Sequence, residues 1–206
     1  RSTLSYEVRK YTHVLFALSA MIALTYHAKK TNIGPILAFT LAVYGLDVLY
    51  QTLVLTYKVE STVFHRLEKG VQVSFKNPPG FRGDSVTGYV YVLLPWISKH
   101  EWHAFSLYSQ SDDCSSICVS ASGDWTRKLH AAVAFDTVRP CFVAGPYTSP
   151  YATATDFDNL VLVASGIGIT PALPIIEHLK ATRRVNLIWM TRDASMIEFF
   201  LSSVDF

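Results

Sequence analysis

The sequence predicts a multi-domain membrane protein with three parts: an α-helical transmembrane hairpin, an antiparallel β-barrel and a truncated α/β nucleotide-binding domain. Apolar residues are concentrated near the N-terminus, short β-rich runs follow, and a glycine turn separates a strand from a helix near the C-terminus. Half of the 206 residues are hydrophobic and only 17% are charged, a composition too apolar for an ordinary soluble domain and incompatible with intrinsic disorder. We expect the parts at residues 1–57, 58–150 and 156–206.

The charged residues argue against nucleic acid as a partner. The chain has 18 Lys and Arg against 16 Asp and Glu, a formal net charge of +2 at pH 7. No block of basic residues occurs after the apolar N-terminal part, whereas a nucleic-acid-binding surface concentrates them. The three cysteines have no zinc-site spacing, so we expect free thiols in a reducing compartment.

Two apolar runs near the N-terminus predict the membrane hairpin. No acidic residue, Lys or Arg occurs between Tyr11 and Ala28, and Asp47 is the only charge between Thr31 and Tyr57. At ~1.5 Å per residue the first run is about 27 Å long, close to a hydrocarbon core of about 30 Å. A secretory signal peptide fits poorly because a second span follows. The chain opens with Arg1 rather than Met, as expected of a piece of a longer membrane protein.

The basic residues around these runs predict the orientation. Lys29 and Lys30 lie in the polar connection between the spans, and a larger basic group lies on the side of both termini. With two spans, we expect an integral, multi-pass protein in a lipid bilayer. Because basic residues favour the cytoplasmic side, we expect both termini on that side. Everything after Tyr57 would then be cytoplasmic.

Two histidines near the ends of the first span are candidate haem ligands. His13 and His27 are fourteen residues apart, which at about 100° per residue places both on one helix face, about 21 Å apart along the axis. Imidazole is a good ligand of haem iron. A histidine within a bilayer is energetically costly, so its presence there indicates a function. The alternative is a pair of interfacial histidines that contact water. The second span contains no histidine, so further axial ligands would come from upstream.

The middle of the chain predicts a small barrel. Several β-rich runs are separated by turn residues, a pattern typical of antiparallel barrels. A single helix is expected between Trp125 and Phe135. The predicted strands are Val71–Phe75, Gly88–Leu94, His103–Ser109, Ser116–Ser120 and Pro140–Ala144.

The last part predicts a nucleotide-binding unit. A buried strand, Leu160–Ala164, leads into a glycine turn, Ser165–Ile169, and then into a helix with Thr170 as N-cap and Pro171 at its first position. Backbone amides at such a turn can hold a pyrophosphate, although the third glycine of the usual fingerprint is missing. A second strand, Val185–Met190, and a helix, Ala194–Ser202, follow. Arg192 stands where a 2′-phosphate would lie, or is a solvated side chain.

Together these motifs resemble the ferric reductase and NADPH oxidase superfamily over almost the whole chain. His13 with His27 is similar to the family's haem-ligating helix, and Glu101–Leu107 to its flavin motif. Ser120–Thr126 resembles the segment that supports the FAD pyrophosphate, and Gly145–Tyr147 resembles the G-P-[YF]-G turn. Ser165–Pro171 resembles the NADPH loop, and Trp189–Phe200 resembles the strand and helix that follow it.

The resemblance implies a ferredoxin-reductase-like barrel that binds FAD, a domain that binds NADPH, and two b-type haems ligated by His13 and His27. Ser106, near the reactive flavin nitrogen, and His103 would be the catalytic residues, and Arg192 would favour NADPH over NADH. The other expected cofactor-binding residues are Gly88, Tyr89, Ala104, Phe105, Gly123, Trp125, Thr126, Gly145, Pro146, Gly166, Gly168, Thr170 and Pro171.

Some positions depart from the family pattern. Ala104 replaces a Pro of the flavin motif, and Thr148 replaces the last Gly of the G-P-[YF]-G turn. The chain ends after two strands of the nucleotide domain, so the family's later Cys-Gly motif is not in it. A non-enzymatic membrane subunit with degenerate cofactor sites therefore stays an alternative, as does a soluble flavoprotein with an anchor.

The resemblance also implies an electron acceptor on the far face of the membrane. The connection between the spans, from about Ala28 to Gly34, is short, whereas the family's oxidases have a long loop over the outer haem. A ferric chelate is therefore the expected acceptor and ferric-chelate reduction the expected activity, with O2 reduction to superoxide as the alternative. The family also allows a regulatory membrane subunit as a partner.

Overall fold

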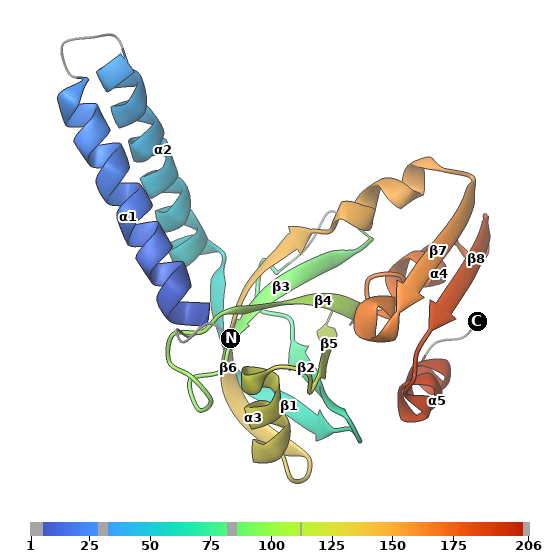
Figure 1. Cartoon of the computed structure of the whole chain (residues 1–206). Coiled ribbons are helices and arrows are strands. Elements are labelled where there is room, and N and C mark those ends of the chain that lie inside the picture. Colours follow the sequence, from blue (N-terminus) through green and yellow to red (C-terminus); the bar gives the residue numbers. More distant parts are fainter. Residues whose placement is uncertain (1–5, 29–32, 82–85, 112, 204–206) are drawn as a thin grey trace. The chain divides into compact units, whose positions relative to one another are not determined.

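The computed structural model describes residues 6–28, 33–81, 86–111 and 113–203. The chain divides into two units between Val54 and Leu55. A helical pair, α1 (Tyr6–His27) and α2 (Ile33–Val54), belongs to the first unit (Figure 1). The second contains β1 (Thr56–Arg66), β2 (Gly70–Lys76), β3 (Gly88–Leu93), β4 (His103–Gln110), β5 (Cys114–Ser120), α3 (Asp124–Ala132), β6 (Thr137–Thr148), η1 (Pro150–Asp156), β7 (Asn159–Ser165), η2 (Gly166–Ile169), α4 (Leu173–Leu179), β8 (Arg184–Met190) and α5 (Ala194–Ser203).

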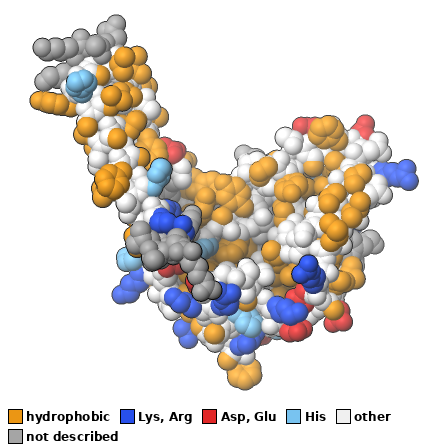
Figure 2. Space-filling model, in the orientation of Figure 1, with side chains coloured by type: hydrophobic (Ala, Val, Ile, Leu, Met, Phe, Trp, Pro, Cys, Tyr) orange, Lys and Arg blue, Asp and Glu red, His pale blue; other side chains and the backbone are white. Residues whose placement is uncertain are grey.

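The first unit is a pair of long helices that lie side by side (Figure 1). Within the described residues, α2 is the one helix long and apolar enough to cross a membrane, judged by length and composition. The helix α1 has the same length of 22 residues, and its Arg9, Lys10, His13 and His27 make it more polar. Hydrophobic side chains are exposed along both helices (Figure 2). The predicted polar connection through Lys29 and Lys30 lies outside the described residues.

The second unit begins with a closed barrel of six antiparallel strands in the order β1-β2-β5-β4-β3-β6. Five of these strands were predicted, and β1 was missed. The helix formed by the second apolar run does not extend to Tyr57. It ends at Val54, and β1 begins at Thr56. A register shift between Val59 and Thr62, where Glu60 and Ser61 are both exposed, interrupts the alternation of buried and exposed residues in β1, so the strand carries a weak sequence signal.

The interior of the barrel is the main hydrophobic core. Phe64, Phe75, Leu107 and Ile117 come from four different strands and are almost completely buried. Their side chains point inward because alternate residues of a strand face opposite sides of the sheet. The helix α3 packs Trp125 and Leu129 against this core.

Parallel strands β7 and β8 form the α/β part of the second unit. The predicted strands and the helix Ala194–Ser202 are confirmed within a residue or two. The prediction of Thr170 as an N-cap is wrong: α4 begins at Leu173 with Ala172 as its N-cap. A 3-10 turn, η2, occupies the preceding residues, and the Thr170 hydroxyl donates a hydrogen bond to the Ile167 carbonyl at 3.0 Å.

A second hydrophobic cluster joins the barrel to the α/β part. Tyr108 and Cys118 of the barrel contribute to it, and the fully buried Phe200 of α5 lies at its centre. The Tyr108 ring meets the Phe200 ring edge to face, with 5.4 Å between centroids. Because the cluster contains buried residues of both parts, it fixes how the barrel and the α/β part pack against each other.

Candidate functional site

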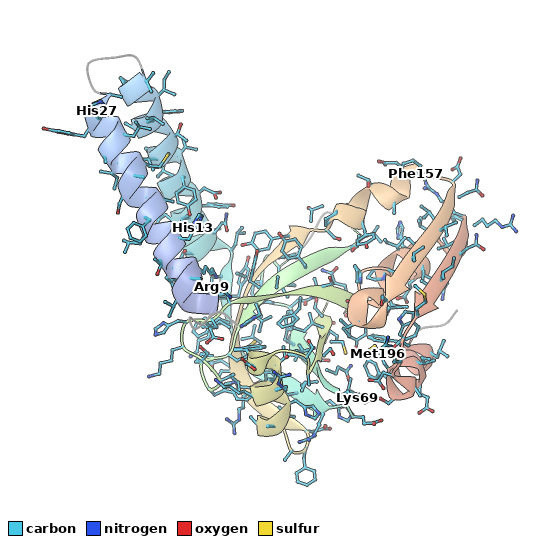
Figure 3. The ribbon with its side chains drawn as sticks, in the orientation of Figure 1. Arg9, His13, His27, Lys69, Phe157 and Met196 are labelled. Carbon is cyan, nitrogen blue, oxygen red and sulfur yellow. The ribbon has the colours of Figure 1, made fainter. Side chains whose placement is uncertain are left out.

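One candidate site lies along the helical pair. His13 lines a groove of about 330 Å³ between α1 and α2, and His27 lies at the far end of α1 (Figure 3). Both histidines are exposed. The groove combines an imidazole with an apolar wall, the environment that a haem ligand requires. Its other lining residues are Val14, Ala17, Leu18, Met21, Thr40, Leu41 and Tyr44.

A second candidate site lies along β3 and β4, where the flavin motif was predicted. Ser106 lies opposite Tyr89 in the antiparallel pairing, and His103 lies opposite Val92. Ser106 is half-buried. The Tyr89 ring stacks on the Tyr147 ring of β6, with 5.4 Å between centroids. The structure therefore brings Ser106, Tyr89 and the turn at Gly145 to one end of the barrel.

Glycines permit this close packing of β3 and β6. An added Cβ at Gly88 would lie 3.1 Å from the Tyr147 carbonyl oxygen. Gly145 has a φ of +128°, which side chains rarely tolerate, and it precedes Pro146 through a cis peptide bond. Thr148, the departure from the G-P-[YF]-G pattern, pairs with Gly88 at the end of β6.

Aromatic rings continue this surface toward α3. The imidazole of His103 lies 4.2 Å from the Trp125 ring, centroid to centroid, and the Phe105 ring stacks on Trp125 at 6.0 Å. His103 Nε2 and Trp125 Nε1 are buried and lack a hydrogen-bond partner among the described residues. Glu101 Oε2 lies 3.5 Å from His103 Nε2, too long and poorly aligned to satisfy it. A buried polar nitrogen atom without a hydrogen-bond partner costs free energy, so both atoms would be stabilised by a further group that pairs with them.

The start of α3 is organised by its own residues. The Thr126 hydroxyl accepts a hydrogen bond from Gly123 N–H at 2.8 Å and donates one to the Gly123 carbonyl at 3.1 Å. Thr126 was predicted to bind a cofactor, but its hydroxyl forms both of these hydrogen bonds with Gly123. Ala104 lies on the exposed side of β4, opposite Tyr91.

A third candidate site is a cleft of about 930 Å³ within the second unit. The ends of β7 and β8 line one side of it, and the β1–β2 turn, the end of β5 and α3 line the other. Gly166 has a φ of +52° and lines the cleft, and an added Cβ at Gly166 or Gly168 would meet no described atom within 4 Å. The glycine turn therefore leaves room for a ligand to approach the backbone.

Among the described residues, the charged lining of this cleft has three cations and two carboxylates, one of them Glu68. Arg192 is exposed and lines it, as predicted for a phosphate ligand, together with Lys69, Arg127 and Asp193. The predicted residues Gly168, Thr170 and Pro171 are not among the residues that line the cleft. Sequence reasoning missed Lys69 and Asp193. Asp193 lies in the Trp189–Phe200 segment that resembles the family but was given no role, whereas Lys69 belongs to no motif. Only the folded chain brings the two together.

Comparisons of sequence identify the families to which parts of this chain are similar. Residues 54–154 match the family described as FAD-binding domain, and residues 157–205 match the family described as Ferric reductase NAD binding domain. Ferric reduction oxidase 8, mitochondrial, of Arabidopsis thaliana is 28% identical over 91% of this chain and 28% of its own length. NADPH oxidase 3 of Rattus norvegicus is 30% identical over 61% of this chain and 24% of its own length. The chain spans about a quarter of these relatives.

Solved structures show the same fold at low sequence identity. A ferredoxin NADP+ reductase from Neisseria gonorrhoeae matches 71% of this chain and 62% of its own with a TM-score of 0.58 and 19% identity. A flavohemoglobin from Malassezia yamatoensis matches 80% of this chain and 46% of its own with a TM-score of 0.59 and 19% identity. The predicted ferredoxin-reductase-like fold class is confirmed by this likeness.

Proposed function

This chain belongs to the ferric reductase and NADPH oxidase superfamily, and from this membership we propose that it carries electrons from NADPH through FAD and two b-type haems to ferric iron on the far face of a membrane. The family is membrane-bound, and its members are oxidoreductases that use FAD and NADPH. The cleft of about 930 Å³ shared by the barrel and the glycine turn supports the proposal most directly. We further propose residues 1–57 for haem, 58–150 for FAD and 156–206 for NADPH.

The flavin surface would be formed by β3, β4 and α3. When bound, FAD accepts a two-electron hydride and passes on single electrons, which haem iron requires. The half-buried Ser106 hydroxyl would hydrogen-bond near the reactive nitrogen, and the His103 and Trp125 nitrogen atoms would gain partners from a polar cofactor. Tyr89, Phe105 and the turn at Gly145–Pro146 would provide flat contacts, and Gly123 would lie near the pyrophosphate.

The nucleotide would lie in the cleft, with its phosphates against the open backbone at Gly166, which lines it. Gly168, which is open in the same turn, would be the second contact. Arg192 would face the 2′-phosphate, which NADH lacks. Thr170 and Pro171 would act indirectly, since the Thr170 hydroxyl holds the turn through the Ile167 carbonyl. These residues fix the glycine turn in place before the ligand arrives, which reduces the ordering cost of binding.

The haems would be held by the helical pair. His13 in its apolar groove supports one ligand, and His27 at the other end of α1 supports a second. Their positions on one helix would place one haem toward each leaflet, with NADPH and FAD on the cytoplasmic side. Ferric iron is the proposed acceptor because a short connection between α1 and α2 would leave an outer haem open to a bulky chelate.

Reduction of O2 to superoxide is the alternative, and the 30% identity to NADPH oxidase 3 favours it. The test uses membranes that contain the full-length protein. NADPH is added without oxygen, the haem absorption spectrum is recorded, and then a ferric chelate or oxygen is admitted. We expect NADPH to reduce the haems and the ferric chelate to reoxidise them.

Variants connect this experiment to the proposed residues. His13→Ala and His27→Ala should each remove one haem band, and Ser106→Ala should slow haem reduction. His178→Ala is the matched control, because His178 is exposed on α4. Faster reoxidation by oxygen with superoxide release would support the oxidase. Unreduced haem despite bound FAD and haem would support the non-enzymatic subunit, and NADPH oxidation that survives both histidine variants would support the anchored flavoprotein.

A further inference from the structure

An ion pair joins the barrel to the α/β part inside the cleft. Lys69 belongs to the β1–β2 turn and Asp193 follows β8, yet Lys69 Nζ lies 3.4 Å from Asp193 Oδ1. Both residues line the cleft. The side chain of Lys69 is 57% exposed and that of Asp193 only 13%. Lys69 can therefore move, whereas Asp193 is held in place.

The Asp193 carboxylate has partners other than Lys69. Ser195 Oγ donates a hydrogen bond to Asp193 Oδ1 at 2.7 Å, and the Met196 backbone amide also bonds to the carboxylate. The Ser195 hydroxyl is the largest cause that holds the pKa of Asp193 below its usual value, and Lys69 and the Met196 amide add to it. The carboxylate caps α5 in this way. If Lys69 leaves, Asp193 keeps two hydrogen bonds and its role as a helix cap.

The neighbouring cations differ in how freely they can meet a ligand. Arg127 donates hydrogen bonds to the Ser122 carbonyl at 2.9 Å and to Asp124 Oδ1 at 2.7 Å. Arg192, next to Asp193, has neither an ion pair nor a hydrogen bond within the described part of the chain. Two exposed positive charges, on Arg192 and Lys69, thus line the cleft from opposite sides, and the Glu68 carboxylate lies beside Lys69 in the chain.

We propose that Lys69 is a specificity-determining residue that leaves Asp193 and joins Arg192 at the 2′-phosphate of NADPH. The inference rests on the proposed function. The ion pair is weakened by the exposure of Lys69 to water, and a phosphate carries close to two negative charges at pH 7 with strong acceptor oxygens. The Lys69 ammonium group is therefore expected to exchange the Asp193 carboxylate for the phosphate as its partner. NADH offers no such group, so Lys69 then stays with Asp193 and adds nothing to affinity.

The test measures binding of two adenosine phosphates to the full-length, detergent-solubilised protein by isothermal titration calorimetry. Adenosine 2′,5′-bisphosphate carries the 2′-phosphate, and 5′-AMP lacks it. Lys69→Met should weaken binding of the bisphosphate about tenfold, the usual effect of losing one charge-assisted hydrogen bond. It should leave 5′-AMP unchanged, and Lys69→Arg should restore the bisphosphate affinity. Lys58→Met is the matched control, since it removes another exposed Lys–carboxylate pair, with Glu60, away from the cleft.

A second variant tests the exchange itself. Asp193→Asn keeps an N-cap side chain but removes the competing negative charge, so it should tighten bisphosphate binding several-fold. Equal weakening of both ligands by Lys69→Met, or no weakening of either, would overturn the inference. The calorimetric result is independent of electron transfer. Failed haem reduction with the predicted discrimination intact contradicts only the proposed electron path, and normal haem reduction without it contradicts only the role of Lys69.

Discussion

At the scale of single residues, burial sets the chemistry of the thiols. Cys118 and Cys141 are buried in the second unit, and Cys114 is exposed. Burial raises the pKa of Cys118 to about 12 and that of Cys141 to about 11, because a thiolate loses its hydration in an apolar interior. A hydrogen-bond contact with Thr62, at 3.1 Å, partly offsets the effect at Cys141.

We therefore expect iodoacetamide at pH 8 to modify Cys114 and to spare Cys118 and Cys141 until the chain is unfolded. The thiolate is the reactive form, and the two buried thiols are both protonated and inaccessible. Mass spectrometry of peptides from native and denatured protein measures the three sites separately. Rapid native labelling of Cys118 would show that the cluster around it opens.

The same thiols predict how stability depends on pH. Their pKa values in the folded chain lie above the ordinary value of 9.0, so the native state binds protons more tightly than the unfolded state. The free energy of unfolding should be unaffected by them below about pH 9, and it should fall as the pH rises toward 11 and 12. Chemical denaturation at pH 8 and pH 10.5 tests this sign, with Cys118→Ala expected to reduce the difference.

At the scale of elements, close strand packing makes one glycine irreplaceable. Gly70 begins β2 and pairs with Ser120 of β5. A Cβ at Gly70 would lie 2.6 Å from the Val119 carbonyl oxygen, and a backbone atom within a barrel ladder cannot move aside. Gly70→Ala should therefore destabilise the barrel by about 2 kcal/mol. Gly45→Ala in α2, where an added Cβ meets no described atom within 4 Å, is the control, and equal thermal unfolding midpoints for the two variants would contradict this account.

The elements also show where sequence patterns are informative. The strands at Leu160 and Val185 were predicted because apolar residues run through both, and the glycine turn between them was marked by residue type. The strand β1 was missed because a register shift at Glu60 and Ser61 breaks the alternation of buried and exposed residues. The start of α4 was misplaced since Thr170 uses its hydroxyl within a 3-10 turn, a choice that residue type does not reveal.

At the scale of the whole second unit, the cluster around Phe200 makes the barrel and the α/β part cooperate. Phe200 is fully buried, and its ring meets those of Tyr108, Trp189 and Phe199. Tyr108 is anchored in turn, because Gln72 Nε2 donates a hydrogen bond to its hydroxyl at 2.7 Å. The cleft has one wall from each part, so its shape depends on this cluster.

Phe200→Ala should lower the free energy of unfolding by about 3–5 kcal/mol, since it leaves a cavity in a packed core. It should also weaken nucleotide binding, because the two walls of the cleft lose their common support. Phe157→Ala is the control, as Phe157 is 58% exposed (Figure 3). Thermal unfolding and limited proteolysis of the purified protein measure both effects. A Phe200 variant as stable as the Phe157 variant would show that the parts fold independently.

The sequence by itself determined the order of the parts, most of the strands, and the motifs at Ser106, Gly166 and Arg192. Periodicity and residue type are local signals, and each of these features depends on local backbone conformation. Only the tertiary structure decided that Lys69 meets Asp193, that Trp125 lies on His103, and that Phe200 closes the second cluster. These contacts join residues far apart in the chain, and the free energy that forms them comes from packing whole elements, which no single segment encodes.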